Sequence, residues 1–232
     1  AVEPGSVQVE DGRVRLQARV AGETREFRAE ALLIAVGREP VTAGFGLENR
    51  ERVTYGPGGF IQVDGFGRTG DPAIYAIGDV AGGGLAHVAS HQGIVAMEHI
   101  AGRNPEPFDP ARVPRCVYTR PEVASVGYTE ARAREMGREV KVGTFPWRGI
   151  GKALVHGSLD GFAKIVADAE TGDVLGVHVI GPDATNLISE AGLAMTLNAS
   201  VWEMSQVIRP HPTLSEILGE AAMAVEGHAI HM

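Results

Sequence analysis

The first part of the chain alternates hydrophobic and polar residues in short runs that turns separate. The runs Val7–Val9, Arg13–Val20 and Thr24–Ala29 follow this pattern, with Asp11-Gly12 and Gly22 between them. A period of two residues is typical of strands with one buried face, and such turns join antiparallel neighbours. We therefore expect a small β-meander at the start of the chain.

Two later runs are apolar at every position instead. Ala31–Val36 ends at Gly37, and Ala73–Ile77 is followed by Gly78-Asp79. A continuous apolar run of this kind predicts a strand buried on both faces, as in the parallel sheet of an α/β domain. The segment before Ala31 is too short to supply the other strands, so we expect the chain to begin in the middle of a domain.

A helical pattern and a proline-rich segment follow the second apolar run. Three glycines, 82–84, precede a helical pattern over 86–100. Residues 102–114 contain Pro105, Pro107, Pro110 and Pro114, which indicates a linker and a domain boundary.

The remainder predicts an α+β domain built on an antiparallel sheet, because strands are grouped with helices and do not strictly alternate with them. Asp168–Asp173 has the composition of a hairpin turn between two strong strands. The expected strands are 116–118, 123–126, 140–145, 162–167 and 174–180, and the expected helices are 129–136, 184–197 and 200–207.

Near the end of the chain, His211 stands between Pro210 and Pro212. Both prolines restrict the backbone, so the imidazole has little freedom. Thr213 and Glu216 have capping-box spacing, with Thr213 as the N-cap of a helix that continues to about Val225. Two interpretations stay open on these residues alone. Glu216 caps the helix and nothing more, or it orients a catalytic imidazole.

Composition narrows the class of protein. The net charge of −8 and the pI of about 5.5 argue against a nucleic-acid surface. No apolar run has the length of a membrane span, and the first residues lack a signal-peptide pattern. The single cysteine, Cys116, fits a reducing compartment, so we expect a cytoplasmic protein with no internal disulfide. No Cys/His spacing indicates a metal site.

The segment Thr69–Asp79 carries the most specific motif. An acidic residue at the carboxyl end of a buried strand is where open α/β sheets contact ligands, so Asp79 is a candidate acceptor for a sugar-like hydroxyl. The start of the next helix, at Leu85-Ala86-His87, offers free N–H groups and the positive end of a dipole. This arrangement suits the pyrimidine end of a flavin. The alternative is that Asp79 only caps that helix.

These motifs together resemble the flavin-dependent pyridine nucleotide–disulfide oxidoreductases. The resemblance rests on ALLIAVGREP at 31–40, the Thr69–Asp79 motif, Leu85-Ala86-His87, VYTRPEVASVG at 117–127 and HPTLSE at 211–216. It covers essentially all of the chain in the same order. Within the family, the motifs are most similar to those of the dihydrolipoamide dehydrogenases.

The resemblance implies a role for each matching residue. His211 would be the acid–base residue that takes a proton from a dihydrolipoyl thiol, with Glu216 holding its tautomer. It also implies a cis His211–Pro212 bond. Gly37 would line the NAD site. The residues implied for FAD are Asp79, at the ribityl chain, and Gly84, Leu85, Ala86 and His87, along the flavin pyrimidine.

The resemblance also implies an α/β plus α+β organisation. Residues 1–38 would be the tail of an NAD-binding α/β domain, 39–110 a central FAD-contacting domain, and 111–232 an α+β dimerisation domain whose antiparallel sheet is flanked by helices. The histidine of this family serves the active site of the partner subunit, so a homodimer is implied. The further partner would be the lipoyl domain of a 2-oxo acid dehydrogenase or glycine-cleavage complex.

Two kinds of alternative stay open: another member of the same family, and a fragment without activity of its own. A glutathione reductase-like enzyme or a soluble transhydrogenase is compatible with the motifs, whereas mercuric reductases usually lack the histidine. The chain contains no glycine-rich loop for FAD or NAD pyrophosphate and no redox-active cysteine pair, so we expect these features upstream of Ala1. An inactive dimerising fragment is therefore the other hypothesis.

Overall fold

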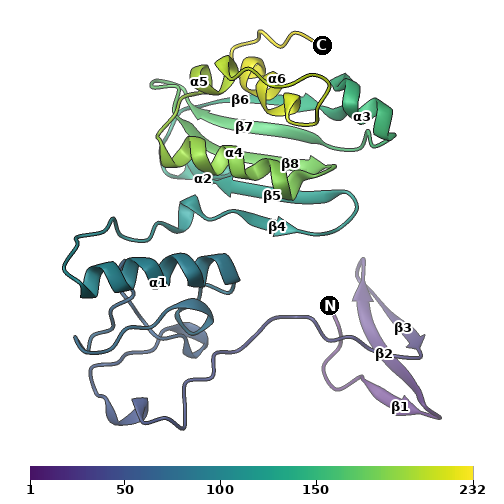
Figure 1. The fold of residues 1–232 in the computed structure, drawn as a ribbon. Helices are drawn as coiled ribbons and strands as arrows, with labels where there is room; N and C mark the ends of the chain where they lie inside the picture. Colours follow the sequence, from purple (N-terminus) through teal and green to yellow (C-terminus); the bar gives the residue numbers. More distant parts are fainter. Residues whose placement is uncertain (232) are drawn as a thin grey trace.

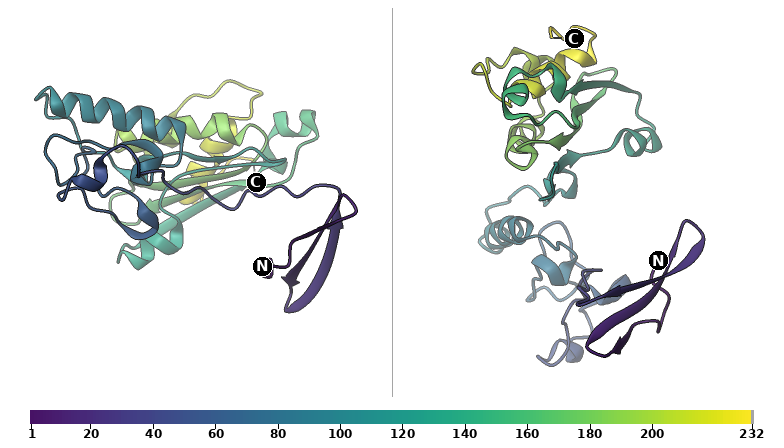
Figure 2. Two further views of the ribbon diagram at one scale, coloured as in Figure 1. Left: turned by 90° about the horizontal axis from the view of Figure 1, so that it is seen from below. Right: turned by 90° about the vertical axis from the view of Figure 1, so that its right-hand side faces the viewer.

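A computed structural model describes residues 1–231, which form three parts along the chain (Figure 1). A small sheet comes first, a mostly irregular segment with one long helix follows, and a sheet–helix unit occupies the C-terminal half. The small sheet stands apart from the rest in Figure 1 and in the left view of Figure 2.

The first sheet confirms the predicted meander. Its strands β1 (Gln8–Glu10), β2 (Arg13–Val20) and β3 (Glu23–Ala29) pair antiparallel in that order. Both connections are two-residue turns in which each residue has a positive φ, 49° and 74° at Asp11-Gly12 and 51° and 88° at Ala21-Gly22. Two positive φ values in succession match the twist of a tight hairpin.

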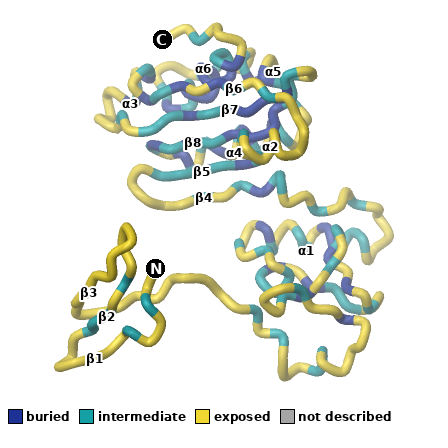
Figure 3. The backbone as a smooth tube through the Cα atoms, turned by 180° about the vertical axis from the view of Figure 1, so that it is seen from behind, coloured by how far each residue is buried: buried dark blue, intermediate teal, exposed yellow. Residues whose placement is uncertain are grey.

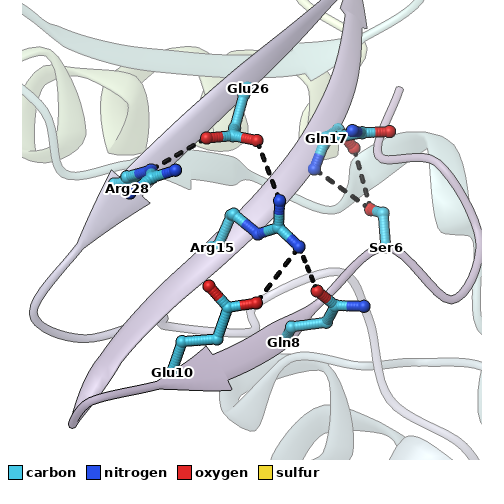
Figure 4. A network of polar contacts seen from close by, with 7 residues as sticks. All are labelled: Ser6, Gln8, Glu10, Arg15, Gln17, Glu26 and Arg28. Atoms are coloured by element: carbon cyan, nitrogen blue, oxygen red, sulfur yellow. Dashed lines mark hydrogen bonds and ion pairs between the residues drawn. The ribbon is translucent and has the colours of Figure 1, made fainter.

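Polar contacts cover one face of this sheet (Figure 4). Arg15 on β2 contacts Glu26 and Glu10 at 3.2 Å each and also bonds to Gln8, while Glu26 accepts a bond from Arg28. The Arg28 guanidinium holds the pKa of Glu26 below its usual value. Water screens exposed ion pairs, so these contacts contribute little to stability and do not replace a packed apolar face.

The predicted strand Ala31–Val36 is wrong for this structure. The segment has no regular secondary structure, and the side chains of Leu33 and Val36 are about 88% and 93% exposed. A doubly buried strand needs neighbours to pair its backbone and cover both faces. No such neighbour lies beside it in residues 1–231. The apolar pattern is therefore present without the sheet that it requires.

The predicted strand Ala73–Ile77 is also wrong, since only an isolated bridge joins Tyr75 to Arg68. Its residue Ala76 instead packs with Val53 and Ile61 in a small separate core. Short 3₁₀ segments lie at Leu47–Asn49, Pro57–Gly59 and Gly78–Ala81.

The predicted helix over 86–100 is confirmed as α1 (Ala86–Ile100). Its N-cap residue, Leu85, directly follows the three glycines that the sequence places before the helix.

The C-terminal half is built on an antiparallel five-stranded sheet of order β4-β5-β8-β7-β6, as predicted. Every predicted strand and helix of this half is present to within two residues at each end, and the turn Asp168–Asp173 joins β7 to β8. The strands are β4 (Arg115–Val117), β5 (Glu122–Gly127), β6 (Val140–Pro146), β7 (Phe162–Asp168) and β8 (Val174–Gly181), and the first helices are α2 (Glu130–Glu135) and α3 (Gly151–His156).

Helices cover this sheet on both faces (Figures 1 and 3). The helices α4 (Ala184–Thr196) and α6 (Glu216–Val225) lie on one face, α4 over β5 and β8 and α6 over β6 and β7, with α5 (Val201–Gln206) beside α6. Ala133 of α2 packs on the other face. Buried residues are concentrated here, whereas the β1–β3 sheet is largely exposed (Figure 3).

Gly143 permits the close approach of α6 to the sheet. A Cβ at this position of β6 would lie 2.3 Å from the carbonyl oxygen of Ala221 and 2.5 Å from the backbone nitrogen of Val225. The absence of a side chain lets the second half of the α6 backbone, from Ala221 to Val225, rest directly on the strand.

Candidate active site

The structure brings His211 and Glu216 together. The imidazole Nδ1 lies 2.9 Å from Glu216 Oε1, and the His211 side chain is 73% exposed while that of Glu216 is 20% exposed. The His211–Pro212 peptide bond is cis, as the resemblance implies. A mostly buried carboxylate therefore holds an imidazole whose other nitrogen, Nε2, is open to a reactant.

The charge on Glu216 follows from three opposing influences. Burial alone would raise its pKa, but the backbone N–H of Thr213 and the imidazole of His211 outweigh burial, so the pKa lies below its usual value. An ionised carboxylate can only accept hydrogen bonds, which makes Nδ1 of His211 the donor. The neutral imidazole then carries its free lone pair on Nε2, the state that a general base requires.

The expected cap of α6 needs a correction. Its N-cap residue is Ser215, not Thr213, and the Thr213 hydroxyl donates to the carbonyl of Pro210 at 2.7 Å instead of accepting from the helix. Half of the capping box remains, because Glu216 Oε2 accepts from the Thr213 N–H at 2.9 Å. Glu216 thus supports the helix start and also binds the imidazole, so capping is not its only role in the structure.

A second His–Glu pair lies one helical turn further along α6, and sequence reasoning missed it. The Glu220 side chain is 5% exposed, and its Oε1 lies 2.6 Å from Nδ1 of His231. Its other oxygen accepts from the backbone N–H of Ile230 at 2.9 Å. The four-residue spacing of Glu216 and Glu220 places both on one helix face, which is the signal that the sequence offers for this pair.

Asp79 lies in the 3₁₀ segment Gly78–Ala81, after the predicted strand that does not form. Its carboxylate is 43% exposed and lies 3.3 Å from the guanidinium of Arg38. It does not cap α1, whose N-cap residue is Leu85. The carboxylate therefore remains accessible as an acceptor.

The other predicted FAD residues, Gly84, Leu85, Ala86 and His87, lie at the start of α1. Gly84 has a φ of 65°, and nothing lies within 4 Å of where its Cβ would be. No side chain caps α1, so the N–H groups of Ala86 and His87 are left for a ligand or solvent. The His87 ring lies 2.9 Å from the carbonyl oxygen of Pro114. Gly37 lies in the exposed irregular segment, apart from any strand.

Open glycines, free amides and an accessible carboxylate are the donor and acceptor set that suits hydroxyl and carbonyl oxygens of a flavin. These groups and His211 do not meet within one chain. Helix α1 lies beyond the β4 edge of the five-stranded sheet, whereas α5 and α6, which the His211 loop joins, lie toward its β6 edge (Figure 1).

Two family models match the chain, one over its sheet–helix unit and one over its first part. Residues 113–222 match the dimerisation domain of the pyridine nucleotide-disulphide oxidoreductases, and residues 3–93 match a second domain with the same family description. The chain belongs to the pyridine nucleotide-disulphide oxidoreductase family.

Curated relatives place the similarity within that family. The chain is 56% identical to a dihydrolipoyl dehydrogenase of Bacillus subtilis over 94% of its own length and 46% of the relative's. A dihydrolipoyl dehydrogenase of Thermus scotoductus is 48% identical over 98% of this chain and 49% of that protein. The chain thus spans about half the length of the curated relatives that it matches.

Solved structures agree on the fold. The crystal structure of LpdA from Mycobacterium tuberculosis superposes with a TM-score of 0.86 at 32% identity, covering 95% of this chain and 48% of that one. The flavoprotein disulfide reductase RclA from Escherichia coli gives 0.82 at 28% identity, over 96% and 49%. A sheet-based dimerisation domain is therefore common to the matched family and this chain.

Helix length and hydropathy also bear on membrane association. Within residues 1–231, no helix combines the length and apolar character that crossing a membrane requires.

Proposed function

We propose that the chain forms the C-terminal part of a dihydrolipoyl dehydrogenase, which oxidises protein-bound dihydrolipoamide and passes the electrons to NAD. The His211–Glu216 pair carries this proposal, because an exposed imidazole nitrogen backed by an ionised carboxylate suits proton removal from a thiol. The names of the curated relatives support the choice of substrate.

His211 would take the thiol proton at Nε2 and so generate a thiolate, the nucleophilic form of sulfur. The carboxylate of Glu216 would stabilise the positive imidazolium that results and keep Nδ1 protonated throughout. Exposure of the His211 ring, at 73%, leaves room for a dithiol to reach it.

FAD and NAD are the proposed cofactors, and bound FAD would supply the electron transfer between the dithiol and NAD. Gly37 would line the NAD site. The FAD contacts would be the Asp79 carboxylate and the backbone atoms at the start of α1, at Gly84, Leu85, Ala86 and His87. The free N–H groups there favour a ligand oxygen that gains negative charge.

The proposed division of the chain is residues 1–38 in an NAD-binding domain, 39–110 in a central FAD-contacting domain and 111–232 in the interface domain. In a homodimer, His211 would serve the active site of the partner subunit. The separation of His211 from the start of α1 within one chain supports this arrangement. The lipoyl domain of a 2-oxo acid dehydrogenase or glycine-cleavage complex would bring the substrate.

The experiment uses the full-length enzyme that contains this chain. His211→Gln should lower dihydrolipoamide oxidation by about 10²- to 10⁴-fold, the usual contribution of a general base. Reduction of ferricyanide by NADH passes through the flavin without dithiol chemistry, so it should stay near the wild-type rate.

His228→Gln is the matched control, because His228 is an exposed histidine outside either His–Glu pair. It should leave both reactions unchanged. A wild-type rate of dihydrolipoamide oxidation in the His211→Gln enzyme would refute the proposed role.

A further inference from the structure

Arg209 lies two residues before His211 and is buried, which is unusual for an arginine. Its side chain is only 7% exposed. The neighbouring side chains on the loop, Ile208 and His211, are 96% and 73% exposed, so they have little packing to hold them in place. Arg209 is thus the point at which the first half of this loop enters the protein interior.

The guanidinium of Arg209 joins two helices. One nitrogen, Nη2, pairs with the carboxylate of Glu190 on α4. The other, Nη1, donates to the carbonyl oxygens of Met204 at 3.1 Å and Val207 at 3.2 Å, at the end of α5. Carbonyl groups at a helix C-terminus lack helical partners and form the negative end of the dipole, so a cation suits this position.

The same guanidinium also touches α6. A Cβ at Gly219 would lie 2.6 Å from Nη1 of Arg209, so the glycine makes room for the side chain. The Nε atom is buried and has no hydrogen-bond partner in residues 1–231. Arg209 therefore sits between three helices, and its charge is balanced by Glu190.

We propose that Arg209, anchored by Glu190, is a positioning residue that sets the location of His211 for dithiol oxidation. The loop between α5 and α6 is held at two points, by Arg209 before His211 and by Glu216 after it. The two prolines stiffen the loop, but they do not attach it to the rest of the domain. The inference rests on the catalytic role proposed for His211.

Loss of the Arg209 anchor should affect the dithiol reaction and leave the flavin reaction unchanged. Arg209 does not reach the reactants, so its loss changes the placement of the imidazole while the flavin site stays intact. Misplacement of a catalytic group by about 1 Å lowers a rate by as much as about a hundredfold. Loss of folded protein would instead lower every reaction of the enzyme in the same proportion.

The test is the substitution Arg209→Met in the full-length enzyme. Methionine keeps an apolar side chain of similar length but lacks the guanidinium group. Dihydrolipoamide turnover should fall about tenfold to a hundredfold. Ferricyanide reduction by NADH and the flavin content per subunit should match the wild type. Arg132→Met is the matched control, because Arg132 lies on α2 with its side chain 62% exposed, and it should change neither rate.

Two further variants change residues that contact the Arg209 guanidinium. Glu190→Gln keeps the size and one acceptor but removes the charge, so it should lower the ratio of dihydrolipoamide to ferricyanide rates by a smaller factor. Gly219→Ala displaces the guanidinium and should lower the ratio as well. If Arg209→Met gives no folded enzyme, the ratio of dihydrolipoamide to ferricyanide rates in these two variants tests the positioning role instead.

The outcomes separate the two proposals. A normal rate ratio in the Arg209, Glu190 and Gly219 variants, with a strongly reduced ratio in His211→Gln, would overturn the positioning role alone. A normal ratio in His211→Gln would remove the proposed function itself. A parallel fall of both rates in Arg209→Met would show a structural role and would also overturn the inference.

Discussion

Glu216 has two partners, and the change Glu216→Gln separates them. Its two carboxylate oxygens lie 2.9 Å from the imidazole of His211 and 2.9 Å from the backbone nitrogen of Thr213. An amide of the same size has one acceptor oxygen and one donor nitrogen. It can therefore satisfy one partner and not both.

Either orientation of the amide has a cost that the structure defines. If the NH₂ group faces His211, the imidazole must accept at Nδ1, and Nε2 becomes the protonated nitrogen that cannot take a proton from a thiol. If it faces Thr213, two donors oppose each other at the start of α6. A hydrogen bond to a charged group contributes about 1.5–3 kcal/mol. Converted at 1.36 kcal/mol for each tenfold change, this predicts a kcat for dihydrolipoamide oxidation lower by about 10- to 150-fold.

The assay pairs the dihydrolipoamide reaction with NADH–ferricyanide turnover in the full-length enzyme, and thermal unfolding is measured on the same samples. Glu135→Gln on α2 is the matched control, since its carboxylate is 66% exposed. Glu216→Gln should lower the first rate selectively. Equal dihydrolipoamide kcat values for Glu216→Gln and wild type would refute the reasoning about the carboxylate.

Three further predictions concern the body of the domain. Gly143→Ala should lower the free energy of unfolding by about 1–3 kcal/mol in denaturant titrations, because the new Cβ would press against the backbone of Val225; an unchanged midpoint would contradict this. Burial lowers the pKa of His178 on β8, so its neutral form stabilises the fold above the unfolded pKa of about 6.5, and stability is lost as the pH falls below that value. His178→Gln should therefore reduce the loss of Tm between pH 7.5 and pH 5.5, and an equal loss in both proteins would refute it. Burial and the nearby Glu122 raise the pKa of Cys116, so in the 232-residue chain it should react with iodoacetamide several-fold more slowly than free cysteine at pH 8; equal rates would show an accessible thiolate.

The sequence predicted those strands and helices whose formation depends mainly on residues close together in the chain. The strand β7 is a largely apolar run that a hairpin turn follows, and α1 begins shortly after three glycines, so both were found from the sequence. The run Ala31–Val36 has an equally strong pattern but forms no strand, because its pairing partners are absent from the described chain. A strand is a property of a sheet, and one segment does not determine it.

The same distinction applies to the candidate site. His211 and Glu216 are five residues apart, so a short motif revealed them together. The partner of Arg209 lies 19 residues away on another helix, and that of Glu220 lies 11 residues further on. Contacts of this kind depend on how distant segments pack. The spacing of Glu216 and Glu220 places both on one helix face, but it does not identify the partner of either Arg209 or Glu220. The proposed roles of Asp79 and Gly37 likewise remain predictions.

The placement of α6 over β6 governs when a growing chain acquires its reactive pair. Lys141 at the start of β6 bonds to Glu226 at the end of α6, a contact across 85 residues. Until α6 leaves the ribosome, half of one sheet face, including Phe145 and Ile165, has no cover. The nascent chain therefore exposes an apolar surface from the synthesis of β7 until α6 is in place. Because the same helix carries Glu216, the covering of that surface and the pairing of His211 with Glu216 both require α6 to be in place.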